Sequence, residues 1–310
     1  MGIARRAELV MGSAQIGLDY GAANRTGKPA REAALRLVRR AADRGVVTFD
    51  TARAYGDAEE RLGEALDGRR SVRTITKLSA LGDLAADASR EAVMAAVDAS
   101  IGQSLAALRR TSLDCLLLHR ARHITAYRGV VWARVKDHLA SGVIAALGVS
   151  VQSPAEAHEA LREASVTHIQ LPFNLLDWRW RDAGVIAALR SRPEVTVHAR
   201  SIFLQGVLIA GDPRLWQRVP GVDGPRLIAW LEETARAFGR EGVADLALAY
   251  ARGQDWIDGV VIGQETEAQL DGNLRLCDRP VLAPEDCARI AARAPRVPES
   301  LLDPAQWTPQ

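Results

Sequence analysis

The chain has 310 residues, of which 48% are hydrophobic and 25% are charged, and its formal net charge is +2. This composition is typical of a globular protein with a sizeable core. The small net charge gives no reason to expect a nucleic-acid partner.

The chain also lacks the usual signals for export or for a membrane. Its three cysteines form no C-x-x-C pair, which argues against a disulfide framework or a structural zinc site. No signal-type apolar stretch follows the N-terminus. The longest nearly apolar run, residues 142–151, is about half of the roughly 20 residues that cross a bilayer. We therefore expect a soluble, cytoplasmic protein with no membrane association and no bound metal.

Eight short runs of β-branched residues and leucine predict strands, and helical patterns separate them. In chain order the runs are 9–14, 46–50, 73–77, 113–119, 144–150, 167–172, 195–200 and 258–263. Regular alternation of strand and helix indicates parallel βα units, and eight of them predict one α/β domain over residues 1–310, a (β/α)8 TIM barrel. A doubly wound sheet would more often carry a glycine-rich nucleotide turn, and neither G-x-G-x-x-G nor G-x-x-x-x-G-K-[ST] occurs.

Local motifs refine this outline. Capping boxes are predicted where a cap residue precedes Glu or Gln by three positions, at Asp57, Ser153 and Thr266. The segment 201–257 is long for one βα unit, so we expect an extra loop or helix there. The C-terminal extension, about 294–310, contains four prolines and predicts no regular structure.

Four residues near strand ends could carry chemistry, because active sites of such barrels lie at the carboxyl ends of the strands. Asp50, Lys77 and His119 end three consecutive predicted strands, and Tyr55 follows Asp50 in the next loop. A phenol is a weak acid at neutral pH, but a neighbouring ammonium favours its ionised form. Asp50 would keep Lys77 charged, and His119 could hydrogen-bond an oxygen that gains negative charge. The group therefore suits reduction of a carbonyl by a hydride donor, or the reverse oxidation.

Other interpretations remain open at this point. Taken singly, a strand-end aspartate commonly caps a helix, a loop tyrosine commonly packs, and a strand-end histidine is commonly hydrogen-bonded core. Lys77 could instead be the nucleophile of a Schiff-base aldolase, although Asp50 would disfavour the neutral amine. A non-catalytic, cofactor-binding regulatory subunit is the third possibility.

Several motifs together resemble the aldo-keto reductase family over nearly the whole chain. In chain order they are FDTARAYG, TITK, DCLLLH, ALGVS, IQLPFNLLD and VIGQETEAQLDGN. The resemblance implies a barrel that binds NAD or NADP without a Rossmann domain, with Tyr55 as proton donor, Asp50 and Lys77 tuning it, and His119 orienting the carbonyl. It also implies cofactor contacts at Ser150, Gln170, Asn174, Arg200, Ser201, Gly263, Gln264, Glu265, Gln269 and Asn273.

Two positions depart from the family pattern. Many members have an aromatic residue stacked on the nicotinamide where this chain has Arg200, which could stack, meet an acidic substrate group or pair with a neighbouring carboxylate. Members that bind NADP usually supply a basic residue after Gly263, where this chain has Glu265 and no Lys or Arg before Arg275. A carboxylate would repel the 2′-phosphate and accept hydrogen bonds from free ribose hydroxyls, which favours NAD unless a basic side chain comes from elsewhere.

The substrate is predicted only as a class. The segment MGSAQIGLDYGAANRTGKP resembles a bacterial subgroup associated with sugar metabolism and with surface-polysaccharide or natural-product pathways. This favours a sugar or another small polar carbonyl compound as the partner of the enzyme. Trp178 and Trp180, with Phe173, could form a stacking wall for it, although tryptophans there more often pack against a loop.

Overall fold

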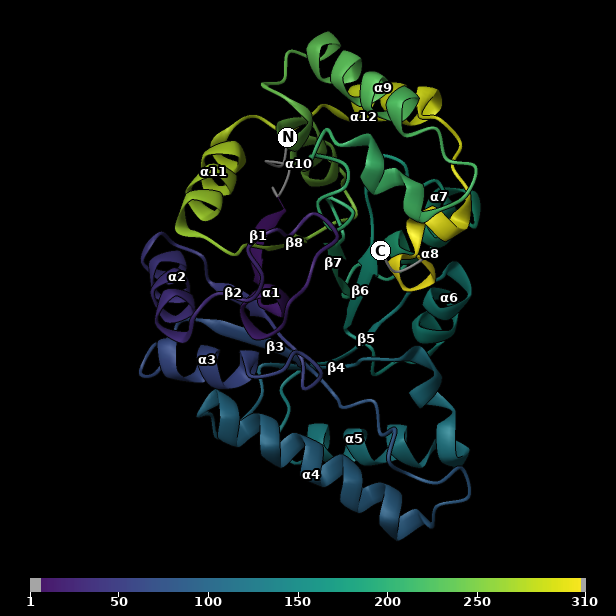
Figure 1. Cartoon of the computed structure of the whole chain (residues 1–310). Helices are drawn as coiled ribbons and strands as arrows, with labels where there is room; N and C mark the ends of the chain where they lie inside the picture. Colours follow the sequence, from purple (N-terminus) through teal and green to yellow (C-terminus); the bar gives the residue numbers. More distant parts are fainter. Residues whose placement is uncertain (1–6, 308–310) are drawn as a thin grey trace.

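Eight parallel strands close into a barrel in chain order, with β8 paired to β1 (Figure 1). The structure is a computed structural model, and it describes residues 7–307. The strands are β1 (Glu8–Gly12), β2 (Thr48–Asp50), β3 (Arg73–Lys77), β4 (Cys115–Leu118), β5 (Leu147–Ser150), β6 (His168–Pro172), β7 (Thr196–Arg200) and β8 (Gly259–Gly263). All eight predicted strands are present, with boundaries shifted by no more than three residues. The predicted (β/α)8 barrel is confirmed.

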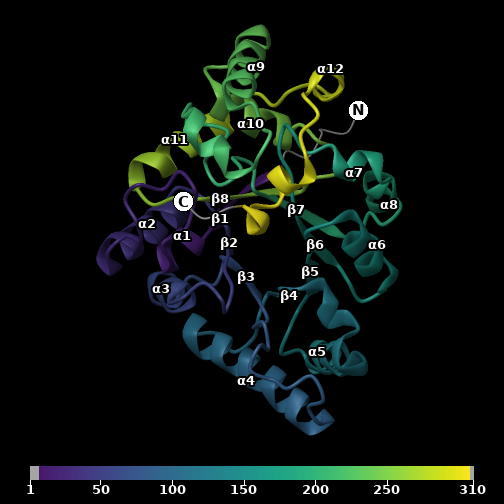
Figure 2. The ribbon, with the colours of Figure 1, turned by 45° about the vertical axis from the view of Figure 1, so that its right-hand side comes forward.

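Helices surround the barrel, and α9 and α12 lie outside α10 as a further layer (Figures 1 and 2). The α-helices are α1 (Ala14–Gly17), α2 (Arg31–Asp43), α3 (Ala58–Ala65), α4 (Arg90–Leu108), α5 (Val130–Ala140), α6 (Pro154–Arg162), α7 (Arg179–Asp182), α8 (Val185–Arg190), α9 (Gly224–Ala237), α10 (Val243–Arg252), α11 (Glu267–Asp278) and α12 (Pro284–Arg293). The 3-10 helices are η1 (Ala121–Ile124), η2 (Ala126–Gly129), η3 (Pro213–Arg218), η4 (Glu299–Leu302) and η5 (Pro304–Gln306). No helix among residues 7–307 is both long and apolar enough to cross a membrane.

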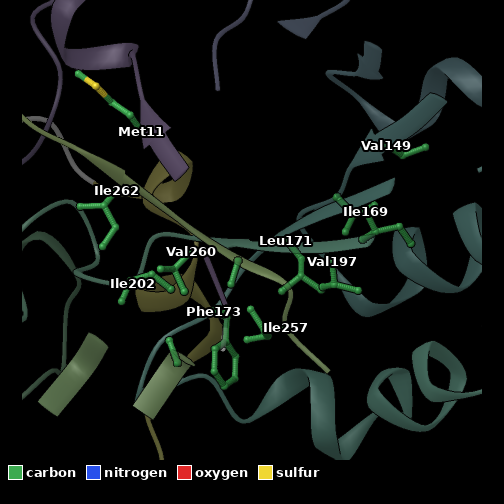
Figure 3. Close-up of a cluster of buried hydrophobic side chains, with 14 of the residues drawn as sticks. Met11, Val149, Ile169, Leu171, Phe173, Val197, Ile202, Ile257, Val260 and Ile262 are labelled. Atoms are coloured by element: carbon green, nitrogen blue, oxygen red, sulfur yellow. The ribbon is translucent and has the colours of Figure 1, made fainter. Parts of the chain in front are cut away.

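Side chains alternate between the barrel interior and the layer under the helices. In β4, Leu116 and Leu118 belong to the large core cluster, whereas Cys115 and Leu117 form a separate small cluster with Ile75. Such alternation is expected because successive side chains of a strand point to opposite faces. Figure 3 shows the outer cluster, with Ile169 and Leu171 among the side chains that come from β6. The small cluster therefore lies inside the barrel, and the large one lies under the helices.

The long segment 201–257 contains a turn-rich loop, η3, α9 and α10, as the extra length predicted. The prediction for the C-terminal extension is wrong in part, since η4 and η5 lie within it and Leu301 and Leu302 are buried. Asp303 caps η5 by accepting a hydrogen bond from the Ala305 amide. The extension lies beside α7, where the Trp178 indole donates to the Val297 carbonyl at 3.1 Å. Burial of leucines, together with these local bonds, orders a segment that is rich in proline.

Of the three predicted caps, only the box of Thr266 with Gln269 is complete. Ser153 caps α6, but the Glu156 side chain accepts from the Gln152 amide instead of that of Ser153. The prediction for Asp57 is wrong, because its carboxylate makes no cap and instead forms ion pairs with Lys28 and Arg61.

Candidate active site

A buried ion pair lies at the carboxyl ends of β2 and β3. The Lys77 ammonium donates to both carboxylate oxygens of Asp50 at 2.7 Å and to the Thr51 carbonyl at 2.9 Å. From β6, Gln170 Nε2 donates to Asp50 Oδ2 at 2.6 Å. Because β2 and β6 are four strands apart, this contact shows that both side chains point into the barrel.

Lys77 stays charged in this setting. Burial disfavours the ammonium, but the charge of Asp50 and its hydrogen bonds outweigh burial, and the pKa of Lys77 is raised. A charged lysine is a poor nucleophile but a permanent cation for its neighbours. Its place within the barrel depends on Asp50, since an unpaired buried charge is costly.

Tyr55 lies between that cation and His119. The Lys77 ammonium is 5.1 Å from the centre of the Tyr55 ring, and the rings of Tyr55 and His119 meet edge to face with centres 5.8 Å apart. Burial and the charge of Lys77 lower the pKa of His119 to about 3, so its imidazole is neutral at neutral pH. The four residues singled out from the sequence are thus brought together, and a neutral imidazole can donate a hydrogen bond to an oxygen without changing its own charge.

The loop that carries Tyr55 is held tightly. A Cβ atom on Gly17 would lie 1.9 Å from the Tyr55 carbonyl oxygen, so only glycine permits this approach. Gly56, with a φ of +57°, meets the Gly17 carbonyl in the same way. The buried carboxylate of Glu59 accepts from Thr76 Oγ1 at 2.5 Å and pairs with Arg53. The predicted cap at Asp57 is absent, so the two glycines and Glu59 hold this loop.

A cavity of about 520 Å³ runs from Asp50 and Tyr55 towards α11. Six residues implied as cofactor contacts line it: Arg200, Ser201, Gly263, Glu265, Gln269 and Asn273. Ser150, Gln170, Asn174 and Gln264 are buried and lie outside the lining. Polar lining residues that the sequence did not point to include Gln15, Tyr20, Asn24 and Gln205. Three of these belong to the N-terminal motif, which was read only as a mark of a subgroup.

The residues present fit a nicotinamide dinucleotide. Ser13 Oγ, which lines the cavity, is buried without a hydrogen-bond partner in the described part of the chain. Buried polar groups are almost always satisfied, so this atom indicates a polar ligand. The 12-residue helix α11 begins at Glu267, four residues after Gly263, and its N-terminus suits an anionic group.

Trp178 and Trp180 lie elsewhere. Trp180 is fully buried with its indole donating to Asp177, and Arg296 stacks on the Trp178 ring at 3.3 Å from its centre. Neither residue lines the cavity, and Phe173 packs on Tyr250 and Trp256. The role of the two tryptophans in substrate binding stays a prediction.

The two departures from the family pattern do line the cavity. The hydrogen bonds of Arg200 go to neutral acceptors, so the neighbouring carboxylate considered from the sequence is not its partner among residues 7–307. Glu265 lies at the α11 end together with Arg275, whose guanidinium pairs with Glu241 at 2.6 Å.

Comparison with known proteins adds independent findings. The family model described as "Aldo/keto reductase family" matches residues 8–294. A holo-form aldo-keto reductase from Bacillus halodurans is 20% identical, with a TM-score of 0.74 and coverage of 94% of this chain and 93% of that one. A structure from Pseudomonas aeruginosa assigned to the aldo-keto reductases is also 20% identical, with a TM-score of 0.62 and coverage of 88% and 90%. At this identity the solved structures show the fold alone. No curated protein matches the chain in sequence.

Proposed function

Because this chain belongs to the aldo/keto reductase family, whose members are oxidoreductases that use NAD(P)H, we propose that it interconverts a carbonyl and an alcohol with Tyr55 as proton donor. The observation that carries the proposal is the position of the Tyr55 ring between the Lys77 ammonium and the neutral His119 imidazole. Both neighbours favour negative charge on a nearby oxygen.

Each residue has a defined task in this reaction. A nicotinamide dinucleotide held in the cavity would supply the hydride for the carbonyl carbon. His119 donates a hydrogen bond to the carbonyl oxygen, and Tyr55 transfers its phenolic proton to the same oxygen to form the alcohol. The Lys77 ammonium stabilises the phenolate left behind, and Asp50 holds that ammonium in place. In the direction of oxidation, Tyr55 takes the proton back.

We further propose NAD as the preferred dinucleotide. Glu265 lines the α11 end of the cavity, where its carboxylate would repel a 2′-phosphate. The guanidinium of Arg275 lies at that end too, but it is already paired with Glu241. If the Arg275–Glu241 ion pair were broken, the Arg275 guanidinium could bind the 2′-phosphate of NADP.

The substrate we propose is a small polar carbonyl compound, with sugars as the leading class. Polar side chains from the N-terminal motif, including Gln15, Tyr20 and Asn24, face the cavity and can hydrogen-bond hydroxyl groups. The free cysteines Cys115, Cys277 and Cys287 support a reducing, cytoplasmic setting for the reaction.

The Schiff-base alternative loses its support at Lys77. An imine needs the neutral amine, whereas this lysine donates three hydrogen bonds and has a raised pKa. Membership of an enzyme family likewise removes the basis for a non-catalytic subunit.

Substitution Tyr55→Phe tests the proposal. We expect the dissociation constants of NADH and NADPH, titrated side by side by tryptophan fluorescence, to stay near those of the native protein, with NADH bound more tightly. Carbonyl turnover should fall by about 10²- to 10⁴-fold, the range of a lost general acid. Tyr127→Phe is the matched control, because Tyr127 lies outside the cavity and only donates to the Leu84 carbonyl at 3.4 Å. Native turnover in Tyr55→Phe would remove Tyr55 from the reaction.

A further inference from the structure

Arg200 presents unused hydrogen-bond donors to the cavity. Its Nη2 donates to the Val151 carbonyl at 3.2 Å and to Gln152 Oε1 at 2.7 Å, and its Nη1 approaches Ser201 Oγ at 3.5 Å. A guanidinium has five N–H donors in a fixed plane. The Nε donor and one Nη1 donor therefore find no acceptor among residues 7–307, although the side chain is half-buried.

The charge of Arg200 is also uncompensated at its end of the cavity. Only four charged residues line this cavity within the described chain: Asp50, Arg200, Glu265 and Arg275. Asp50 is neutralised by Lys77, and the other two lie at the α11 end. The catalytic end therefore carries an excess positive charge. This charge reaches the reacting groups, since Arg200 contributes, after burial, Lys77 and Arg120, to the lowered pKa of His119.

The guanidinium is held in place before any ligand arrives. Arg200 ends β7, and its guanidinium reaches past β6 to Val151 and Gln152 in the loop after β5. These contacts fix its position. A pre-oriented guanidinium binds a carboxylate through parallel hydrogen bonds with little further loss of side-chain freedom. Partial burial strengthens such a contact relative to one in open water.

We propose that Arg200 binds a carboxylate of the substrate, so that the enzyme acts on oxo acids, including sugar acids, in preference to neutral carbonyl compounds. The inference rests on the proposed reductase function and narrows its substrate class. The dinucleotide phosphates are the other anions that enter this cavity. If Arg200 served them, its loss would weaken cofactor binding and leave the choice of substrate unchanged.

The test compares two aldehydes, the anionic 4-carboxybenzaldehyde and its neutral methyl ester, at saturating NADH. In the native enzyme kcat/KM should favour the acid, and Arg200→Gln should reduce the acid-to-ester ratio by about 10- to 100-fold, as for a lost charge-assisted hydrogen bond. Arg200→Lys should retain part of the preference because it keeps the charge. Arg275→Gln is the matched control, since it removes a guanidinium from the other end of the same cavity and should leave the ratio as it is.

An unchanged ratio in Arg200→Gln would overturn the inference, and a simultaneous loss of NADH affinity would assign Arg200 to the cofactor phosphates. If the native protein binds NADH but reduces neither aldehyde, the proposed function fails. Arg200 is then judged by titrating the NADH complex with 4-carboxybenzyl alcohol and its methyl ester. Tighter binding of the acid, lost in Arg200→Gln, would uphold the anion site, and equal binding of both alcohols would overturn it.

Discussion

Substitution Gly17→Ala should displace Tyr55 while leaving the tyrosine side chain itself unchanged. Gly17 ends α1, and an added Cβ would lie 1.9 Å from the Tyr55 carbonyl oxygen and 2.8 Å from the Ala58 amide nitrogen. Both are backbone atoms, so no flexible side chain can turn aside. Ordinary contact begins near 3.4 Å, and the Tyr55 loop would therefore have to retreat by about 1.5 Å from α1.

The cost can be estimated in two parts. Overpacking of a tight contact typically destabilises a protein by about 1–3 kcal/mol. Misplacement of a catalytic group by about 1 Å can lower the rate by roughly 10²-fold. We therefore expect a folded protein whose carbonyl turnover is about 100-fold lower, while NADH affinity changes little because Gly17 does not line the cavity.

The assay is steady-state turnover together with the urea unfolding midpoint and an NADH titration. Gly102→Ala serves as the control, because Gly102 is an exposed residue of α4 whose added Cβ would meet nothing within 4 Å. That change should keep turnover and stabilise the helix by about 0.5–1 kcal/mol. Native turnover in Gly17→Ala would refute the view that this contact positions Tyr55.

Two further predictions concern buried charge. Asp50→Asn or Lys77→Met alone should lower the free energy of unfolding by about 3–5 kcal/mol, since each leaves an unpaired buried partner. The double variant should recover much of that loss without turnover; denaturant titration checks this, and an additive loss would contradict it. Burial lowers the pKa of His168 to about 3 and that of His198 well below its usual value, so unfolding takes up protons below pH 6.5. Unfolding free energy should then fall by about 1.4 kcal/mol per pH unit for His168 as the pH drops from 6.5 towards 3, and His198 should add to the fall below pH 6.5. A flat profile in urea titrations would exclude this.

The barrel and the four central residues could be predicted because chain direction and strand ends carry the information. All strands of a parallel barrel end at the same rim. The alternation of strands and helices along the chain therefore predicts that Asp50, Lys77 and His119 lie close together. Tyr55 could be assigned to the same site because it follows Asp50 by five residues. None of these inferences required the distance between two elements far apart in the chain.

Predictions failed where competing partners lie far away in sequence. Asp57 has the sequence of a cap, but Lys28 supplies an ion pair at 2.7 Å that a local pattern does not reveal. The C-terminal extension has the composition of an irregular segment, but η4 and η5 form within it. The ordered extension itself depends on burial of Leu301 and Leu302 beside α7. Such choices are decided by tertiary contacts, which override local preference.

Strands β6 and β7 each carry a buried histidine and, two positions later, a polar residue of the candidate site. In β6, His168 and Gln170 are two positions apart and both buried, and in β7 the same spacing joins His198 to Arg200. The rings of His168 and His198 meet edge to face with centres 4.3 Å apart, whereas Gln170 contacts Asp50 and Arg200 faces the cavity. Because residues two positions apart share a face of the strand, the two histidines lie in the barrel below Gln170 and Arg200. Because both histidines precede the cavity-facing ends of their strands and neither lines the cavity, changes there should alter stability while leaving the choice of substrate to residues nearer the carboxyl ends.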